Sequence, residues 1–235
     1  MSWPKSLISS DWGSTTAIAP NGENVVVFAN KICEVNPDGN YTQIGLEWPK
    51  IIAATTNGNF IYAIYPDGFI YKISTSSYTS VFKWAEAGGG WERAKAIFAY
   101  NDHIYVVRDS IWEIRLDGTY HMVQNDNWGA TRSITVIVDY AYSVHDNGII
   151  YKINLKDWTY RILSKGWAKT FRFQLLTLDN KLFAYDVYLT MVDTNTGSKH
   201  VIHKDNWNSK LAGCSTANAM YTAFTSGNLW KITKS

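Results

Sequence analysis

The chain has 235 residues, a formal net charge of +2 and a hydrophobic content of 46%, which suits one large domain or two small ones with a real core. Its Lys and Arg residues are scattered, so the charge pattern excludes the basic surface that nucleic acid or an anionic membrane would need. No apolar run is long enough to span a membrane, and the N-terminus lacks a signal-peptide pattern. We therefore expect no nucleic-acid partner and no membrane insertion. The protein is expected to be cytosolic, exported without a leader, or the mature form of a secreted protein.

From the N-terminus onward, the sequence repeats one unit six times, and three markers recur in each unit. The first marker is a tryptophan, found at Trp12, Trp48, Trp91, Trp128, Trp167 and Trp207. The second is a strand-like tetrapeptide that reads ICEV, IYKI, IWEI, IYKI, LTMV and LWKI. The third is an apolar strand that holds Val26, Tyr62, Tyr105, Tyr142, Phe183 and Tyr221. The markers stay in phase along the chain, which indicates a structural repeat.

Each unit contains short β-branched and aromatic runs, such as FIYAIY, between turn sequences such as NPDGN and DNG. The period of two predicts antiparallel strands, because Gly and Asn supply the positive φ angles that hairpin turns require. We predict an all-β fold, a six-bladed β-propeller of four-stranded antiparallel blades, in a single domain that spans residues 1–235. The expected blades are residues 13–48, 49–91, 92–128, 129–167, 168–207, and 208–235 together with 1–12. The hairpin between the second and third strands is two residues longer in the second, fourth and sixth units.

The two ends of the chain complement each other. The last unit supplies three strands and stops, whereas the N-terminal segment KSLISSDW resembles the strand that precedes Trp167 and Trp207 in other units. We expect Ser6 to Asp11 to pair beside Leu229 to Ile232, because strand exchange between the termini closes a propeller and protects its edges. An open β-solenoid would not need such complementary ends.

Known catalytic and metal-binding motifs are absent from the sequence, so we expect no enzyme activity, no metal and no cofactor. The five histidines are dispersed along the chain, and the single carboxylates in turns are typical of side chains that cap their own turn. Channel-lining residues from several blades could still converge, which a sequence does not show. The two cysteines, Cys33 and Cys214, lie in apolar strands and are predicted to be buried free thiols.

The repeat tryptophans allow two interpretations. As one large ring per unit, each could be a wedge between neighbouring blades. Alternatively, each could be a platform for a sugar ring, because the residues beside it are polar or small and could bond sugar hydroxyls. On the second interpretation the carbohydrate-binding residues are Asp11, Trp12, Trp48, Gly90, Trp91, Asp126, Asn127, Trp128, Trp167, Asp205, Asn206 and Trp207.

The segment GGGWERAKAIFAYNDHIYVVRDSIWEI resembles the repeat of tachylectin-type lectins, in which Gly-Gly-Trp precedes an inner strand. Six blades with N-terminal closure also resemble the tectonin-type lectins. Both resemblances imply non-catalytic, multivalent binding of glycans or glycoconjugates, with N-acetylglucosamine-containing or related glycans as the first candidates.

The repeat favours a lectin on physical grounds as well, because several weak sites on one rigid ring gain avidity on a glycan-covered surface. The alternative is a protein-interaction scaffold, for which we expect a charged or apolar patch contributed by a few divergent blades. The sequence leaves the oligomeric state open.

Overall fold

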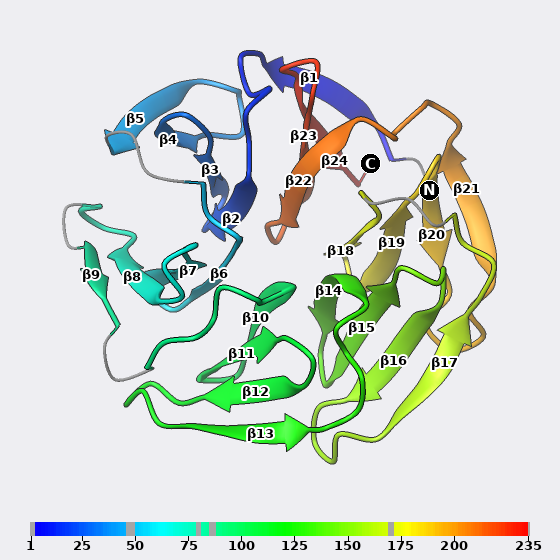
Figure 1. The fold of residues 1–235 in the computed structure, drawn as a ribbon. Helices are drawn as coiled ribbons and strands as arrows, with labels where there is room; N and C mark the ends of the chain where they lie inside the picture. Colours follow the sequence, from blue (N-terminus) through cyan, green and yellow to red (C-terminus); the bar gives the residue numbers. More distant parts are fainter. Residues whose placement is uncertain (1–2, 46–49, 79–80, 85–87, 169–171, 235) are drawn as a thin grey trace.

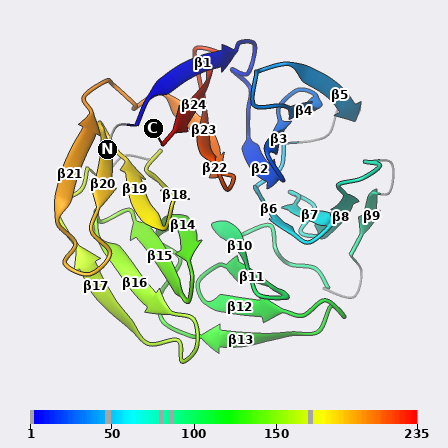
Figure 2. The ribbon, with the colours of Figure 1, turned by 180° about the vertical axis from the view of Figure 1, so that it is seen from behind.

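The computed structural model describes residues 3–45, 50–78, 81–84, 88–168 and 172–234. Six four-stranded antiparallel sheets are arranged in a ring around a central channel (Figure 1), and the view from behind shows the same closed ring (Figure 2). The predicted six-bladed β-propeller is therefore confirmed. We number the blades 1 to 6 in chain order.

In blades 1 to 5 the strands run from the channel outward in chain order. Blades 1 to 3 are formed by β2 (Ala17–Asn21), β3 (Asn24–Phe28), β4 (Ile32–Val35), β5 (Tyr41–Gly45); β6 (Ala53–Asn57), β7 (Phe60–Ile64), β8 (Ile70–Ser74), β9 (Val81–Lys83); and β10 (Ala96–Tyr100), β11 (His103–Val107), β12 (Ile111–Ile114), β13 (Tyr120–Gln124). Blades 4 and 5 are formed by β14 (Thr131–Ile137), β15 (Tyr140–His145), β16 (Ile150–Asn154), β17 (Tyr160–Ser164); and β18 (Gln174–Leu178), β19 (Lys181–Tyr185), β20 (Leu189–Val192), β21 (Lys199–His203).

Blade 6 combines the two ends of the chain. Its strands are, from the channel outward, β22 (Lys210–Ser215), β23 (Ala219–Phe224), β24 (Leu229–Thr233) and β1 (Lys5–Ser9). β1 pairs antiparallel with β24, with Lys5 opposite Ile232 and Ser9 opposite Leu229. The predicted closure is confirmed, although the strand ends at Ser9. It stops short of Asp11 because that residue has a φ of 77°, which is not a strand conformation.

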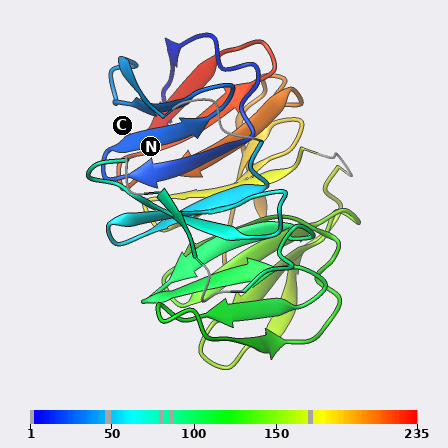
Figure 3. The ribbon, with the colours of Figure 1, turned by 60° about the vertical axis from the view of Figure 1, so that its left-hand side comes forward.

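The ring has two distinct faces because consecutive strands alternate in direction. The linker face carries the connections between blades and the hairpins between second and third strands, and the opposite face carries the remaining hairpins. Figure 3 shows the strands crossing the thickness of the ring between these faces. The described residues contain no helix that is long and apolar enough to span a membrane.

The hairpins between second and third strands alternate around the ring as predicted. In blades 2, 4 and 6 the closing amide-to-carbonyl hydrogen bond joins residues four apart in the sequence, from Tyr65 to Phe69, His145 to Ile149 and Phe224 to Asn228. In blades 1, 3 and 5 the closing bond spans two residues, from Ala29 to Lys31, Arg108 to Ser110 and Asp186 to Tyr188. The fold thus has an internal period of two blades.

The hydrophobic core consists of clusters between neighbouring blades. Alternate residues of each strand point to opposite faces of its sheet, so each blade packs against both neighbours. One cluster, for example, joins blades 6 and 1 and contains both cysteines. Cys33 and Cys214 are free and buried, as predicted, and burial raises the pKa of the Cys214 thiol.

Candidate functional site

The repeat tryptophans are interior residues. Of the six, Trp48 lies outside the described residues, and the other five expose between 1% and 7% of their surface, with Trp12 at the lower limit and Trp167 at the upper. Each of the five belongs to a core cluster shared by two blades. These rings lie where wedges between blades are expected, and they present no open face on which a sugar could stack.

Backbone hydrogen bonds explain why polar residues surround these buried rings. The amide of each described repeat tryptophan donates to a carbonyl in the linker-face hairpin of the blade it leaves, namely that of Gly227, Gly68, Asp109, Gly148 or Val187, in ring order. A tight turn follows, in which the amide of Thr131, for example, donates to the Trp128 carbonyl at 2.9 Å. The flanking residues are turn residues, which are commonly polar.

The predicted polar partners of the tryptophans are exposed, unlike the rings themselves. Asp11, Gly90, Asp126, Asn127, Asp205 and Asn206 all lie at the surface of the linkers. One of them contacts the next blade, because Asp205 accepts an ion-paired hydrogen bond from Lys5. The Asp126 carboxylate lies near enough to the Tyr160 hydroxyl to raise its pKa.

The first residue of the outermost strand contacts the linker that enters its blade. In blade 6 this residue is Lys5, bound to Asp205. In blade 5 it is Lys199, whose Nζ donates to the carbonyls of Lys165 and Gly166 at 2.9 and 3.1 Å. This amine also lies 3.9 Å from the centre of the buried Trp167 ring. The outer strand therefore fixes the linker, and with it the wedge.

In blades 1, 3 and 4 the same position holds a tyrosine, and the same ring pair recurs. Trp12 and Tyr41 have centroids 5.2 Å apart and planes at 78°. For Trp91 and Tyr120 the values are 5.5 Å and 80°. For Trp128 and Tyr160 they are 5.2 Å and 75°. The three tyrosines expose 45%, 48% and 42% of their surface. Each junction thus holds an exposed ring that is fixed edge to face by a buried one.

Sequence reasoning missed these tyrosines, although a signal exists. Tyr41, Tyr120 and Tyr160 precede the next repeat tryptophan by seven or eight residues. Only the position within the outermost strand distinguishes them from the 12 other tyrosines, and that position follows from the fold.

The polar environment is most developed at Tyr160. Partial burial raises the pKa of its hydroxyl, and the nearby Asp126 carboxylate raises it further. At Tyr41 the Lys31 amine lies 4.6 Å from the ring centre. The sequence suggested an exposed aromatic ring beside a charged or hydrogen-bonding side chain at each junction. Such rings occur there, but they belong to the tyrosines and not to the repeat tryptophans.

The central channel is a hollow along the axis of the ring. It has a volume of about 420 Å³ and is lined by the innermost strands of all six blades. Lys95 and Arg132 are the only charged residues among the described residues that line it. Neither was predicted as a site residue, because convergence across blades leaves no mark in a sequence.

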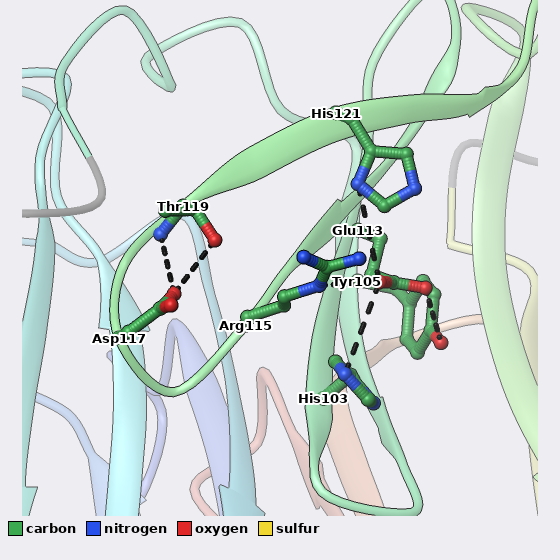
Figure 4. A network of polar contacts seen from close by, with 7 residues as sticks. All are labelled: His103, Tyr105, Glu113, Arg115, Asp117, Thr119 and His121. Atoms are coloured by element: carbon green, nitrogen blue, oxygen red, sulfur yellow. Dashed lines mark hydrogen bonds and ion pairs between the residues drawn. The ribbon is translucent and has the colours of Figure 1, made fainter.

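Blade 3 carries a network of polar side chains around Glu113, shown in Figure 4. Its Oε2 atom accepts a hydrogen bond from Tyr105 at 3.1 Å. Its Oε1 atom lies 3.6 Å from Arg115 Nε, and 3.9 Å from His103 Nε2 and from His121 Nδ1. Within the described ranges, no three His, Cys, Asp or Glu side chains are arranged to hold a metal ion. The network compensates a carboxylate whose side chain is only 14% exposed.

Comparisons with known proteins bear on the fold alone. The sequence matches no described protein family, and no curated protein is similar to it in sequence. Several solved structures are similar in fold. Virginiamycin B lyase from Staphylococcus aureus has a TM-score of 0.71 at 12% identity, and the match covers 99% of both chains.

Two further structures show the same likeness. A protein of unknown function from Bacteroides thetaiotaomicron has a TM-score of 0.72 at 13% identity, over 99% of this chain and 76% of the other. A chain of a nidogen–laminin complex has a TM-score of 0.68 at 13% identity, over 85% and 84%. One of these proteins is an enzyme and another binds a protein, so the propeller fold does not determine function.

Proposed function

We propose that this protein is a non-catalytic, multivalent carbohydrate-binding protein whose sites lie at the outer ends of blade junctions. The exposed tyrosines Tyr41, Tyr120 and Tyr160 are the proposed platforms for sugar rings. The wedge tryptophans, which sequence analysis assigned to this task, act by holding the tyrosines in place.

One observation carries the proposal, namely the recurrence of the same tryptophan–tyrosine geometry in three blades. The three centroid distances lie between 5.2 and 5.5 Å and the interplanar angles between 75° and 80°. A ring that stays nearly half exposed at a fixed angle loses little conformational entropy when a ligand stacks on it. Three such rings around one rigid ring of blades provide the multivalency that weak sugar sites require.

The three sites are not equal. Tyr160 has Asp126 at its hydroxyl, so a carboxylate is available for sugar hydroxyls beside the ring. Tyr41 has Lys31 over its ring, which covers part of the surface that a sugar would use. We expect the Tyr160 junction to bind most tightly and the Tyr41 junction most weakly.

The proposal is tested by glycan-array binding of the wild type, followed by Tyr120→Ala and Tyr160→Ala, singly and together. Each single change is expected to remove one site, and the double change to lower apparent affinity for a glycan surface by more than about tenfold. The matched control is Tyr188→Ala, which removes a tyrosine that is 44% exposed but lies in a hairpin of blade 5. A wild type that binds no glycan, or a double variant that binds as the wild type does, contradicts the proposal.

A protein-interaction scaffold is the second candidate, and the outer strands of two neighbouring blades favour it. β13 and β17 expose Tyr120, Met122, Tyr160 and Ile162, which is the apolar patch from a few blades that a scaffold requires. Met122→Ser with Ile162→Ser separates the candidates. A scaffold loses its partner on this change, whereas sugar binding at the tyrosines remains.

A further inference from the structure

The charged residues of the central channel are unevenly distributed. Of the described residues that line it, two are charged, Lys95 and Arg132, and both are cationic. No carboxylate lines the channel among these residues. A confined space with charges of one sign concentrates the field and attracts the opposite charge.

The two cations occupy equivalent positions in adjacent blades. Lys95 is the fourth residue after Trp91, and Arg132 is the fourth after Trp128. Lys95 immediately precedes β10, and Arg132 is the second residue of β14, so both lie at the linker-face end of the channel. Blades 1 and 6 have Thr16 and Leu211 at this position. The positive charge therefore lies on one side of the channel mouth.

The two cations differ in their surroundings. The Arg132 guanidinium lies 3.5 Å from Asp146, whose side chain is exposed. Lys95 is exposed and has no ion pair within the described part of the chain. A third cation, Arg172 of blade 5, donates a hydrogen bond to the Ser209 carbonyl at 3.5 Å on the same face. Among the described residues, the charged side chains that line the channel are therefore all cationic.

The channel wall also offers hydrogen-bonding groups to a ligand. It is formed by the edges of the innermost strands. The backbone groups on the channel side of these strands have no further strand to pair with. Some side chains pair across blades, as when the Ser133 hydroxyl accepts the Leu175 amide at 3.0 Å. The Gln174 Oε1 atom is buried and has no partner in the described structure. Hydroxyl and amide groups therefore line the same channel as the two cations.

We propose that the linker-face end of the channel binds a small anionic molecule of roughly the size of a sugar ring, with its carboxylate or phosphate group held between Lys95 and Arg132. The volume of about 420 Å³ falls within the range of small-molecule sites. The bidentate guanidinium suits either acid group, and the lysine adds a point charge. This inference goes beyond the proposed function, because the channel lies on the axis of the propeller, whereas the tyrosines lie at the outer rim of the propeller.

The test is titration calorimetry with three probes, which are glucuronate, glucose and inorganic sulfate. Glucuronate is expected to bind, and glucose, which has the same ring without the charge, is expected to bind at least tenfold more weakly. Sulfate is expected to compete with glucuronate. A phosphate-bearing ligand is distinguished from a carboxylate by repeating the titration with glucose 6-phosphate. Whichever of the two binds more tightly identifies the acid group that the site prefers.

Charge reversal locates the site. Lys95→Glu is expected to reduce glucuronate binding at least tenfold, and Arg132→Lys, which keeps the charge but loses the bidentate contact, is expected to reduce it less. Lys204→Glu is the matched control, since Lys204 is exposed on the same face but belongs to an outer linker. Tyr160→Ala is expected to leave this binding unchanged, which separates the inference from the proposed function.

Two results would overturn the inference. One is that neither anion binds at millimolar concentration to the folded wild type. The other is that Lys95→Glu and Lys204→Glu weaken binding equally, because the attraction is then a general effect of net charge.

Discussion

Junctions that follow an even-numbered blade differ in chemistry from those that follow an odd-numbered blade. Between blades 4 and 5, the Lys152 amine donates to the Thr194 carbonyl at 3.0 Å. Between blades 6 and 1, the equivalent Lys231 donates to the Pro37 carbonyl at 3.0 Å. In both cases a lysine of the third strand reaches the last hairpin of the next blade.

Junctions that follow an odd-numbered blade use aromatic rings instead. Between blades 3 and 4, Trp158 folds back so that its ring centre lies 5.2 Å from that of Tyr105. Between blades 5 and 6, the ring centres of Trp3 and Phe183 lie 4.8 Å apart. Between blades 1 and 2, Tyr78 accepts a hydrogen bond from Asn21 at 2.6 Å.

The difference teaches that the structural unit is a pair of blades. Within a pair of an odd and the following even blade, the contact includes an extra aromatic residue. Between pairs, a lysine and a close backbone approach make the contact. Substitutions at equivalent positions are therefore expected to differ according to the junction, and four predictions test this.

The largest effect is expected from deleting residues 1–11, because blade 6 would lose β1 from its edge and Trp3 from its contact with blade 5. The ring would open at one junction of each kind. We expect a loss comparable with the total free energy of unfolding, about 5–15 kcal/mol, measured as the collapse of the thermal transition in circular dichroism. An unchanged melting temperature would show that closure contributes nothing.

A large effect is also expected from Gly197→Ala at the junction between blades 4 and 5. A Cβ atom there would lie 1.9 Å from the Leu163 carbonyl oxygen, and the residue has a φ of 75°. The expected cost is about 3–5 kcal/mol in the free energy of unfolding. Gly22→Ala is the control, because its φ is 60° but no atom lies within 4 Å. Strain alone should cost about 1–2 kcal/mol there, and equal costs at both sites would mean that the close approach is unimportant.

Trp128→Ala tests the wedge within a pair. The ring is 1% exposed, so its removal should cost about 3–5 kcal/mol, as large-to-small core changes do. Trp158→Ala at the same junction should cost less, because that ring is only partly buried. Urea unfolding measures both. A Trp128→Ala protein with the stability of the wild type would refute the wedge assignment.

The smallest effect is a pH dependence confined to the pair of blades 3 and 4. Burial lowers the pKa of His145 to about 4 from its ordinary value of 6.5, and the charge of Asp146 opposes this shift. Between pH 4 and 6.5, the His145 imidazole therefore binds a proton more readily in the unfolded chain than in the folded one. Stability should therefore fall as the pH decreases from 6.5 to 4, by up to about 3 kcal/mol.

The equivalent residues in the other even-numbered blades supply the control for this pH effect. They are Tyr65 and Phe224, neither of which gains charge in this range. His145→Phe is expected to flatten the stability profile between pH 4 and 6.5, as followed by urea unfolding at each pH. A profile as steep as that of the wild type would assign the acid sensitivity to other groups.

The sequence predicted the number of blades and the closure, because strand periodicity and turn residues are local signals that recur six times. It did not predict where the tryptophan rings point. Asp126 and Asn127 are polar because they form an exposed turn, whereas the Trp128 side chain leaves the same backbone in the opposite direction. Polar residues in a sequence indicate that the backbone of that segment lies at the surface. The side chain of the neighbouring residue can still be buried.

The remaining site residues depend on contacts between distant parts of the chain. Tyr160 becomes a candidate platform through a wedge from the preceding blade, and Lys95 acquires its environment from a channel that six blades form together. Such contacts have no fixed sequence spacing across blades. They become visible only when the ring is assembled.

The pairing of β1 with β24 has a consequence for synthesis of the chain. Ser9 is made roughly 220 residues before its partner Leu229, which corresponds to about 10–40 seconds at the usual rates of translation. For that time the first strand lacks its native neighbour, while five blades can already form. The nascent protein therefore resembles an open arc with an unpaired strand at one end, and exposed strand edges favour association between chains. Expression at high ribosome density is expected to favour exchange of this strand between neighbouring copies.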